Sequence, residues 1–368
     1  MKIVVVGPVF PYRGGIAHYN SSLILALRQL GHDVKSISYS RQYPKIFYPG
    51  KSDKDPSLET LVIHSEMIID SINPITWIKC AYSILKYTPD RVIFHWWTSF
   101  WIPLYLFILP YLKNKNINLV GIIHNVYPHE NSIYDKWLVP IVLTKFDHFV
   151  VHSEKEFMKL KKIFPSKKIS KYLHPVYDTL PKHEIDIDCA KQKLGINHNT
   201  NVLLMFGIIR KYKGLEILLN AIDLISKNKI SAENLKLVVA GEFWEPKEKY
   251  VAQINELGIS EYVIFHDRYI PNEEISDFFS AADLFIAPYT EGTQSGALNI
   301  ALAWGLNCII SSSIYDEGLS DFSNIYKFEK GNADELGQII IKLIKNENKE
   351  KNTVILPSWE HLAIICLS

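Results

Sequence analysis

The sequence has little net charge, few cysteines and no long uninterrupted apolar run, and each absence excludes a class of protein. Its 40 Lys and Arg residues are balanced by 39 Asp and Glu residues, so the net charge of +1 provides no basic surface for nucleic acid. The four cysteines are far apart, form no CxxC pair and have no histidine at metal-ligand spacing. We therefore expect reduced thiols, no resident metal and no nucleic-acid partner.

Signals for export or membrane insertion are also weak. The apolar run at residues 2–6 is too short for a signal peptide. The most apolar stretch, residues 96–112, contains two prolines, whereas a bilayer-spanning helix needs about 20 apolar residues. We expect this stretch to form a buried or interfacial helix and the protein to be cytoplasmic.

What the sequence does contain is an alternation of short Val- and Ile-rich runs with longer helical patterns. Strands are predicted in the first half at residues 2–6, 34–38, 91–94, 118–123 and 148–152, with a helix at 16–30. Strands are predicted in the second half at residues 201–206, 236–240, 263–265, 284–287 and 308–311, with helices at 215–229 and 297–304. This alternation is typical of parallel sheets built from β-α-β units, and thus of an α/β fold.

The length and the restart of the pattern predict two domains. A chain of 368 residues corresponds to two domains, each able to bury a core. The pattern begins again after a polar stretch at 181–188, so we assign residues 1–178 to an N-terminal Rossmann-like domain and 179–350 to a second. Such doubly wound sheets bind ligands at the carboxyl ends of their strands, which directs attention to the loops there.

The first such loop, residues 7–15, ends in Gly14 and Gly15 directly before a predicted helix. Two glycines let backbone N–H groups approach an anion, and the helix N-terminus adds about half a positive charge. The spacing is neither GxGxxG nor a Walker P-loop. A tight turn without a ligand explains the same residues equally well.

The second loop, residues 207–214, carries Arg210 and Lys213 between a predicted buried strand and a helix. Arg offers a planar fork and Lys a mobile point charge, which together suit a diphosphate. A solvated basic turn is the alternative. We favour the binding site because both cations lie where open sheets bind ligands.

The third loop, residues 288–299, is rich in Gly, Thr and Ser and leads into an apolar helix. A helix N-terminus of this kind binds anions, although an ordinary N-cap accounts for the serine alone. The residues expected to contact phosphate are Thr293, Gln294, Ser295 and Gly296. Glu291 is expected to accept hydrogen bonds from sugar or ribose hydroxyls.

These loops together resemble a known family. The motifs that carry the resemblance are Gly14-Gly15-Ile16-Ala17, His124-Asn125-Val126, Arg210-x-Tyr-Lys213-Gly214, His266-Asp267-Arg268-Tyr269-Ile270-Pro271 and Thr293-Gln294-Ser295-Gly296. In this order and spacing they resemble the retaining glycosyltransferases of family 4 ("group 1"), in a subgroup with a Thr-Gln-Ser-Gly element. The resemblance covers essentially the whole chain and implies a GT-B fold, two Rossmann-like domains with a nucleotide-sugar in the cleft.

The resemblance also implies roles for individual residues. Arg210 and Lys213 would neutralise the donor diphosphate, and Gly14 and Gly15 would close the first loop over it. His124 would contact the donor sugar near the reacting centre. Residues 351–368 would form a final helix that returns toward the N-terminal domain.

One departure from the family pattern concerns the acidic pair of the third loop. The family has a second acid seven residues after the one at Glu291, whereas this sequence has Asn299. Asn299 still offers an amide to a ribose hydroxyl but no charge. Recognition of the base is assigned to Arg268, Tyr269 and Ile270, which do not separate uracil from guanine.

Three further patterns are weaker. Asp186 and Asp188 imitate a metal-binding DxD motif but lie in the predicted linker. His129 and Glu130 are candidate bases toward the acceptor. Seven lysines between residues 155 and 171 usually mean a solvated face, and anionic lipid is the alternative partner, at about 1 kcal/mol per lysine.

The resemblance therefore implies a retaining glycosyltransferase, and the two cations of the second loop suit a reaction without a metal ion. The enzyme would move a sugar from UDP- or GDP-sugar, a substrate rather than a cofactor, to a glycan or lipid-linked acceptor in bacterial surface polysaccharide synthesis. Peripheral contact with the inner face of the membrane would suit such an acceptor. The alternatives are a GT-B sugar-nucleotide epimerase, a catalytically silent nucleotide- or glycan-binding protein, and, disfavoured by the missing GxGxxG, a nicotinamide oxidoreductase.

Overall fold

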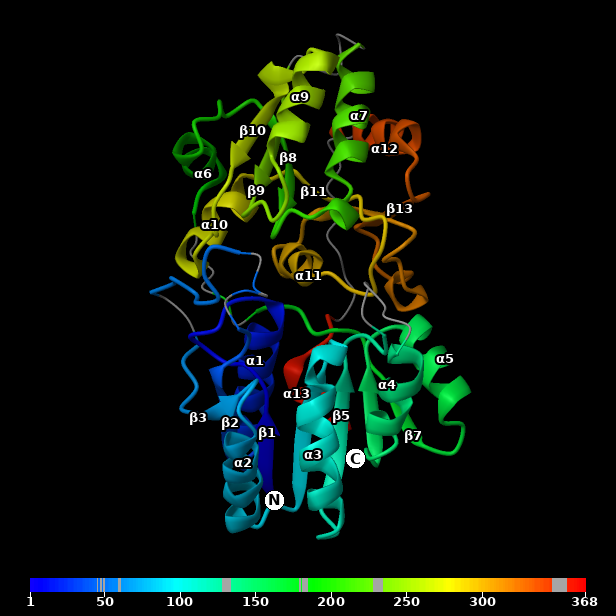
Figure 1. The fold of residues 1–368 in the computed structure, drawn as a ribbon. Coiled ribbons are helices and arrows are strands. Elements are labelled where there is room, and N and C mark those ends of the chain that lie inside the picture. Colours follow the sequence, from blue (N-terminus) through cyan, green and yellow to red (C-terminus); the bar gives the residue numbers. More distant parts are fainter. Residues whose placement is uncertain are drawn as a thin grey trace. The chain divides into compact units, whose positions relative to one another are not determined.

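The chain folds into two compact units, described in a computed structural model that covers residues 1–44, 46, 48, 50–58, 61–127, 134–178, 180, 185–227, 234–345 and 356–368. Unit 1 comprises residues 1–56, 61–175 and 357–368, and unit 2 comprises residues 57–60 and 176–356. Figure 1 shows that each unit is a sheet with helices packed on it. Each unit is described by itself.

The sheet of unit 1 is parallel and seven-stranded, in the order β3-β2-β1-β4-β5-β6-β7. Its strands are β1 (Lys2–Val6), β2 (Asp33–Arg41), β3 (Glu66–Asp70), β4 (Arg91–Trp96), β5 (Asn118–Ile123), β6 (His148–Val151) and β7 (Lys168–Lys171). The central strands are almost wholly buried because helices cover both faces of a parallel sheet. This burial explains their continuous apolar runs.

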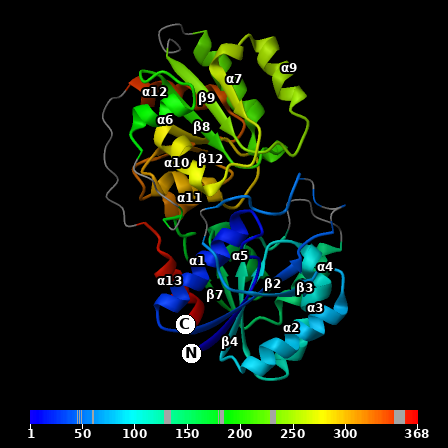
Figure 2. The same ribbon diagram turned by 90° about the vertical axis from the view of Figure 1, so that its left-hand side faces the viewer.

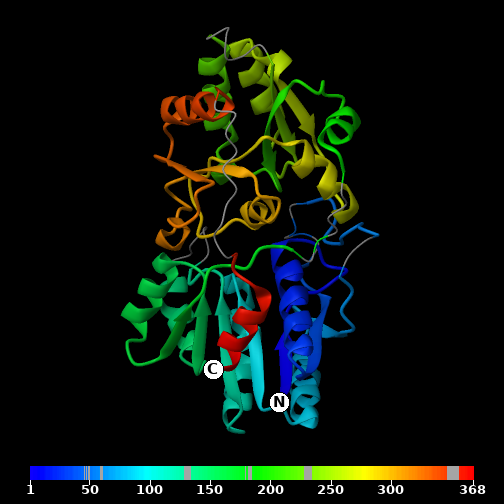
Figure 3. The ribbon, with the colours of Figure 1, turned by 180° about the vertical axis from the view of Figure 1, so that it is seen from behind.

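The helices of unit 1 lie on both faces of this sheet. They are α1 (Gly15–Gln29), α2 (Pro74–Tyr87), α3 (Ile102–Lys113), α4 (Asp135–Leu143), α5 (Glu154–Ile163) and α13 (Trp359–Leu367), with the 3-10 turn η2 (Ser99–Trp101). Figure 2 shows α1 and α13 on one side of the sheet and α2, α3 and α4 on the other. The view from behind in Figure 3 shows α13 beside α1, and the two helices are in contact.

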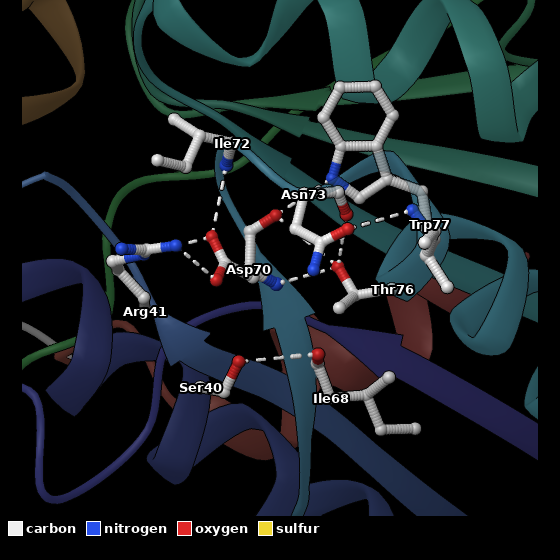
Figure 4. A network of polar contacts seen from close by, with 9 residues as sticks. Ser40, Arg41, Ile68, Asp70, Ile72, Asn73, Thr76 and Trp77 are labelled. Carbon is white, nitrogen blue, oxygen red and sulfur yellow. Dashed lines mark hydrogen bonds and ion pairs between the residues drawn. The ribbon is translucent and has the colours of Figure 1, made fainter.

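The edge strand β3 is held in place by one carboxylate, Asp70 (Figure 4). Arg41 on β2 grips it with two hydrogen bonds, Nε to Oδ1 at 2.9 Å and Nη2 to Oδ2 at 2.5 Å. The same residue joins β3 to α2, because its backbone carbonyl accepts from Trp77 Nε1 at 2.9 Å and its backbone N–H donates to Thr76 Oγ1 at 3.0 Å. Asn73 caps α2 and Pro74 occupies its first turn, which starts the helix directly after the strand.

Unit 2 repeats the architecture with six parallel strands in the order β10-β9-β8-β11-β12-β13. The strands are β8 (Asn201–Phe206), β9 (Leu235–Ala240), β10 (Val263–His266), β11 (Leu284–Ala287), β12 (Asn307–Ser311) and β13 (Ile325–Phe328). The helices are α6 (Ile187–Lys193), α7 (Leu215–Ser226), α9 (Glu248–Leu257), α10 (Asn272–Ala281), α11 (Gly296–Ala303) and α12 (Ala333–Lys345), with 3-10 turns η3 (Lys211–Lys213), η4 (Ser260–Tyr262) and η5 (Glu317–Leu319). Helix α7 packs against α9 and α12, and α6 packs against α10.

The α/β fold class with two doubly wound parallel sheets is confirmed, and every predicted strand is present within two or three residues of its predicted ends. The prediction was wrong in omitting β3, β7 and β13, all of which are edge strands. The helix predicted at 215–229 ends at Ser226, and residues 228 and 229 lie outside the described part.

The apolar stretch at 96–112 forms the end of β4, the turn η2 and most of α3. Trp96 belongs to β4 and Trp101 to η2, and both are fully buried in the core of unit 1. Trp97 donates from Nε1 to Tyr43 Oη at 2.9 Å. No helix in the described residues is long and apolar enough to span a bilayer.

Candidate functional site

Each sheet has one switch point, where the strand order reverses direction, and the candidate loops flank it. In unit 2 the reversal lies between β8 and β11, so the loops 207–214 and 288–295 face each other at the carboxyl edge. In unit 1 it lies between β1 and β4, which brings the loop 7–15 next to the end of β4. The sequence thus places its candidate residues on two such edges.

The loop after β8 is shaped by close backbone contacts. Gly207 N–H donates to Ala240 O at 2.9 Å, and Ile209 N–H donates to Glu242 O at 2.9 Å. A Cβ atom at Gly241, whose φ is +151°, would lie 2.0 Å from Gly207 O. Glycine is therefore required there, and the two loops run side by side without a side chain between them.

A second close approach fixes the end of the same loop. Gly214, with φ of +71°, ends the turn η3 and begins α7, and a Cβ on it would lie 2.0 Å from the backbone oxygen of Pro288. Thr290 N–H donates to Tyr212 O at 2.7 Å. These contacts lock the loop 207–214 against the loop that follows β11.

Lys213 is bound into the third loop through a tyrosine. Its Nζ donates to Tyr289 Oη at 2.6 Å and lies 4.0 Å from the centroid of that ring. Because an ammonium only donates, Tyr289 accepts this bond, and its hydroxyl lies 2.9 Å from Ser295 Oγ. Ser295 in turn caps α11 by accepting from Leu298 N at 3.2 Å. The cation is thus linked to the N-terminus of α11 through the hydroxyls of Tyr289 and Ser295.

Lys213 is half-buried, so its ammonium group is partly removed from water. Removal from water lowers its pKa; Tyr212 raises the pKa and the charge of Arg210 lowers it further. An anionic ligand would restore the lost stabilisation of the charge. Arg210 precedes Lys213 by three residues. Its guanidinium carbon lies 5.7 Å from the centroid of the Trp244 ring and 5.8 Å from that of the Tyr212 ring.

The predicted contacts on the third loop differ in their surroundings. Gln294 has a buried amide nitrogen that finds no hydrogen-bond partner among the described residues, a donor suited to a ligand oxygen. Thr293 precedes it, Gly296 opens α11, and Asn299 is 8% exposed on that helix. Glu291 is exposed at the tip of the loop.

The residues predicted to recognise the base lie after β10. Arg268 is exposed and makes a two-pronged ion pair with Glu274, with Nη1 3.1 Å from Oε1. Tyr269 is half-buried and Ile270 is buried at 5% exposure. The Arg268 guanidinium thus already has a carboxylate partner in unit 2. Its role in recognising the base stays a prediction.

In unit 1 the first loop leads to a helix N-terminus without a side-chain cap. Gly14 has φ of +106° and is the N-cap residue of α1, and Gly15 is exposed as its first residue. The loop is braced by residues 53–55: Arg13 N–H donates to Asp53 O at 3.1 Å, and Asp55 N–H donates to Pro11 O at 2.8 Å. No acidic residue occupies the first turn of α1, so its positive end is not neutralised from within.

Unit 1 also contains a row of histidines that the sequence analysis did not assemble. His95 lies at the end of β4, His124 follows β5, His152 follows β6, and His174 lies three residues after β7. These four strands are neighbours in the sheet, so the four side chains share its carboxyl edge. We refer to these residues as the histidine row.

Tyr19 of α1 lies at the centre of the histidine row. Its ring centroid lies 4.9 to 5.4 Å from each of the four imidazole centroids, in edge-on geometry, and 5.0 Å from that of Trp359 in α13. Burial lowers the pKa of His95 and His174 to about 3 and of His152 to about 4, and that of His124 well below its usual value. The row is therefore neutral at pH 7.

The predicted residue His124 thus belongs to a larger cluster. The signal that would have found His95 and His152 is positional, since each lies at or just after the end of an apolar strand as His124 does. No such signal marks His174, which follows the polar edge strand β7. The weaker candidates His129 and Glu130 lie outside the described residues. Asp186 of the DxD pattern is the N-cap of α6, accepting from Asp188 N at 3.1 Å and Cys189 N at 3.4 Å. The described residues contain no cluster of three metal-ligating side chains.

Two sequence profiles match the chain, and together they cover most of it. The profile described as "Glycosyl transferases group 1" matches residues 186–355, which hold the Lys213 site. The profile described as "Glycosyltransferase Family 4" matches residues 13–171, which hold most of the histidine row. No curated protein matches the sequence.

Solved structures share the fold at low sequence identity. HepE of Anabaena in complex with UDP is 15% identical with a TM-score of 0.70, over 100% of this chain and 94% of that one. Sucrose-phosphate synthase of Thermosynechococcus elongatus is 14% identical with a TM-score of 0.68, over 99% and 97%. WaaG, a glycosyltransferase involved in lipopolysaccharide biosynthesis, is 15% identical with a TM-score of 0.64, over 100% and 94%.

Proposed function

The chain belongs to the group 1 glycosyltransferases of the GT-B fold, and from that premise we propose that it transfers a sugar from a UDP- or GDP-sugar to a glycan or lipid-linked acceptor. The observation that carries the proposal is the pair Arg210 and Lys213 at the switch point of unit 2, joined through Tyr289 to the N-terminus of α11. The UDP held by the fold relative HepE supports the same class of ligand.

The chemistry suits this pair. Glycosyl transfer passes through an oxocarbenium-like state while negative charge develops on the departing diphosphate. A partly desolvated lysine and an arginine stabilise that charge more strongly than solvated cations, because they lie in a medium of lower dielectric constant. The amide nitrogen of Gln294 adds a neutral donor beside them. We propose that these groups replace a divalent cation as the electrophilic aid.

We further propose that transfer proceeds with retention and that His124 contacts the donor sugar. Its neutral imidazole suits a sugar better than a phosphate, since it carries no charge at pH 7. Gly14 and Gly15 at the uncapped start of α1 would meet the phosphates, Asn299 the ribose, and Glu291 the sugar. Product stereochemistry, read by NMR of the glycoside, tests the retaining outcome.

Ligand-dependent thermal unfolding tests the donor site. UDP, GDP, ADP and NAD are added separately to the wild type, to Lys213→Ala and to Lys211→Ala. A ligand at 100 times its Kd stabilises the native state by about 2.7 kcal/mol, which moves the transition by several degrees. We expect UDP or GDP to shift the wild type and Lys211→Ala, whose exposed side chain lies in the same turn, but not Lys213→Ala.

The outcomes separate the candidate functions. A shift with NAD alone, or an equal shift in both lysine variants, overturns the proposed donor site. Nucleotide binding without release of UDP or GDP from the sugar nucleotide in the presence of a glycan acceptor points to a silent binding protein. Conversion of one sugar nucleotide into another without an acceptor identifies an epimerase.

A peripheral membrane contact, in the setting of surface polysaccharide assembly, is part of the proposal. The lysine-rich stretch at 155–171 offers less positive charge to a membrane than its composition indicates. Lys159 forms an ion pair with Glu156, and Lys171 forms one with Glu154. Lys167 donates to the backbone carbonyls of Thr144 and Phe146. A better surface is the outer side of α2, α3 and α4. Large apolar side chains are exposed there at Ile75, Ile78, Tyr82, Phe107, Tyr111, Trp137 and Ile141.

Apolar and aromatic side chains with lysines among them suit the boundary of an anionic bilayer. Lys79, Lys86 and Lys136 are exposed on the same helices. Sedimentation with phosphatidylglycerol vesicles at low salt is expected to retain the wild type and a Lys155→Gln variant. A Phe107→Ser/Trp137→Ser variant is expected to stay in solution. Equal sedimentation of all three would refute this surface.

A further inference from the structure

Three side chains of unit 1 form a hydrogen-bonded series that begins at a backbone carbonyl. Asn20 on α1 donates from Nδ2 to Pro8 O at 3.0 Å. Its Oδ1 lies 3.0 Å from His95 Nε2, and His95 Nδ1 lies 3.2 Å from His124 Nε2. Both nitrogens of His95 are therefore engaged, one on each side.

The position of every proton in this series follows from its first member. A carbonyl oxygen only accepts, so the amide nitrogen of Asn20 faces Pro8 and its oxygen faces His95. His95 must then carry its proton on Nε2 to donate to Asn20. With a pKa of about 3 this ring is neutral, so its Nδ1 bears a lone pair and accepts. His124 Nε2 consequently carries the proton that it donates to His95.

The packing holds Asn20 and His95 in place and stacks His95 on His124. The rings of His95 and His124 are stacked, with centroids 5.5 Å apart and planes inclined by 13°. Both Asn20 and His95 press against Gly7, where a Cβ atom would lie 2.8 Å from His95 Cδ2 and 2.9 Å from Asn20 Nδ2. The absence of a side chain at position 7 is what admits the pair. Both side chains are fully buried.

We infer that Asn20 and His95 are positioning residues that hold His124 as the neutral Nε2–H tautomer, so that its Nδ1 acts as a hydrogen-bond acceptor. The single ring proton of His124 is thus used in the hydrogen bond to the buried His95. A group that reaches the Nδ1 edge must donate a hydrogen bond, as a sugar hydroxyl does and a phosphate or carboxylate oxygen does not. Resting on the proposed function, this assigns His124 to a hydroxyl of the sugar and leaves the diphosphate to unit 2.

The other two members of the histidine row are fixed in the opposite sense. His152 Nδ1 donates to Tyr172 O at 2.8 Å and His174 Nδ1 donates to Pro175 O at 2.6 Å, so both carry the proton on Nδ1. His152 Nε2 then accepts the hydroxyl proton of Tyr19 at 2.7 Å. The histidine row thus contains two Nε2–H and two Nδ1–H imidazoles, so each tautomer can be compared with the other in the same protein.

Tautomers are read directly by long-range ¹H–¹⁵N correlation spectra of protein labelled with ¹⁵N-histidine, because protonated and bare ring nitrogens resonate far apart. At pH 7.5 without ligand we expect Nε2–H for His95 and His124, and Nδ1–H for His152 and His174. A His124→Gln variant assigns the key signals. Wild-type protein in which His124 carries its proton on Nδ1, or exchanges between both forms, overturns the inference.

Two variants test whether the series sets the tautomer. Asn20→Leu removes the acceptor of His95, and His95→Phe keeps the stacked ring without its nitrogens. Each is expected to give mixed tautomers at His124. Ser170→Ala is the matched control, since it removes the partner of another buried histidine, His148, at 2.8 Å, without touching the series. A His124 that stays wholly Nε2–H in both variants refutes the positioning role.

An activity measurement separates this inference from the proposed function. In both variants we expect kcat to fall about tenfold while nucleotide affinity changes less than about twofold, since the lost contact lies on the sugar. Ser170→Ala is expected to change neither. If no sugar is transferred by the wild type, the proposed function fails while the tautomer spectrum still stands or falls by itself.

Discussion

The two units use the same sheet edge for opposite purposes. Unit 1 gathers four neutral imidazoles around Tyr19 and keeps them neutral by burial. Unit 2 places Arg210 and Lys213 at its edge, where Arg210 lies over the Trp244 ring and Lys213 donates to the Tyr289 hydroxyl. The first edge therefore offers hydrogen bonds without charge, and the second offers two cations. A shared fold therefore does not imply a shared ligand.

The two edges are also held in place by different interactions. In unit 1, precision comes from side chains such as His95 and His152, both of whose ring nitrogens are hydrogen-bonded, so the loss of a partner leaves an unsatisfied lone pair or proton in a buried place. In unit 2, it comes from the backbone, where Gly214 and Gly241 admit two loops at contact distance. The edge of unit 1 should therefore be destabilised by protonation of its imidazoles, and the edge of unit 2 by a side chain added at either glycine.

Acidification is expected to break the comparison most strongly. Five histidines of unit 1 and only His266 of the described residues in unit 2 have a lowered pKa. Below about pH 6.5 the unfolded chain binds protons that the folded unit does not, so stability falls as the pH falls, by up to about 1.4 kcal/mol per histidine per pH unit. Unit 1 should lose several kcal/mol between pH 6.5 and 5.5.

Hydrogen exchange followed by mass spectrometry measures this loss separately for each unit. After correction for the intrinsic rate, peptides from β4 and β5 are expected to lose protection well before peptides from β8 and β9. Parallel loss in both units would show that the histidine row does not dominate the acid response.

A methyl group should break the edge of unit 2. Gly214 and Gly258 have nearly the same φ, +71° and +67°, but only at Gly214 would a Cβ meet a backbone oxygen. Gly258→Ala is expected to cost about 1–2 kcal/mol for the left-handed backbone. Gly214→Ala should cost about 4 kcal/mol because of the added clash with Pro288. Urea unfolding measures both, and equal losses would contradict the close contact.

The centre of unit 1 can be probed with a single oxygen atom. Tyr19→Phe keeps the ring between its five aromatic neighbours but removes the hydroxyl that donates to His152. We expect a loss of about 1–2 kcal/mol, the cost of a buried acceptor left unsatisfied. Tyr82→Phe, at an exposed position on α2, is the control and should be neutral in the same urea titration.

The smallest expected effect concerns the DxD pattern. Asp186→Ala removes the N-cap of α6 and should cost about 1 kcal/mol. The rate of sugar transfer is expected to stay unchanged, with or without a chelator of divalent ions. A variant that is stable but inactive, and restored by added metal, would return this pair to the reaction.

The strands that the sequence failed to predict are all at sheet edges. The three strands are β3 (Glu-Met-Ile-Ile-Asp), β7 (Lys-Ile-Ser-Lys) and β13 (Ile-Tyr-Lys-Phe). Each is short and carries at least one charged residue, which an edge strand tolerates because it is covered on fewer sides. Central strands such as β5 and β8 were predicted to the residue because burial on both faces demands an unbroken apolar run. Burial, rather than strand formation itself, is what the pattern reported.

The sites follow the same logic. The position of Arg210 and Lys213 at the carboxyl edge of the sheet was predictable because the two cations follow an apolar strand in one short loop, and their role in binding a diphosphate stays a prediction. The partner of Lys213, Tyr289, lies 76 residues away, and only the fold brings them together. His95, His152 and His174 each resemble an ordinary buried histidine in isolation. Their common edge depends on strand order, which no local pattern contains.

The helix α13 has a consequence for how this protein is made. Residues 357–368 belong to unit 1, lie along α1 and bring Trp359 against Tyr19. In the sequence, residues 176–356 of unit 2 separate them from the rest of unit 1. During synthesis, the ribosome therefore releases every strand of unit 2 before it releases the helix that completes unit 1. The first unit to begin is the last to be finished, and until then Tyr19 lacks one of its five aromatic neighbours.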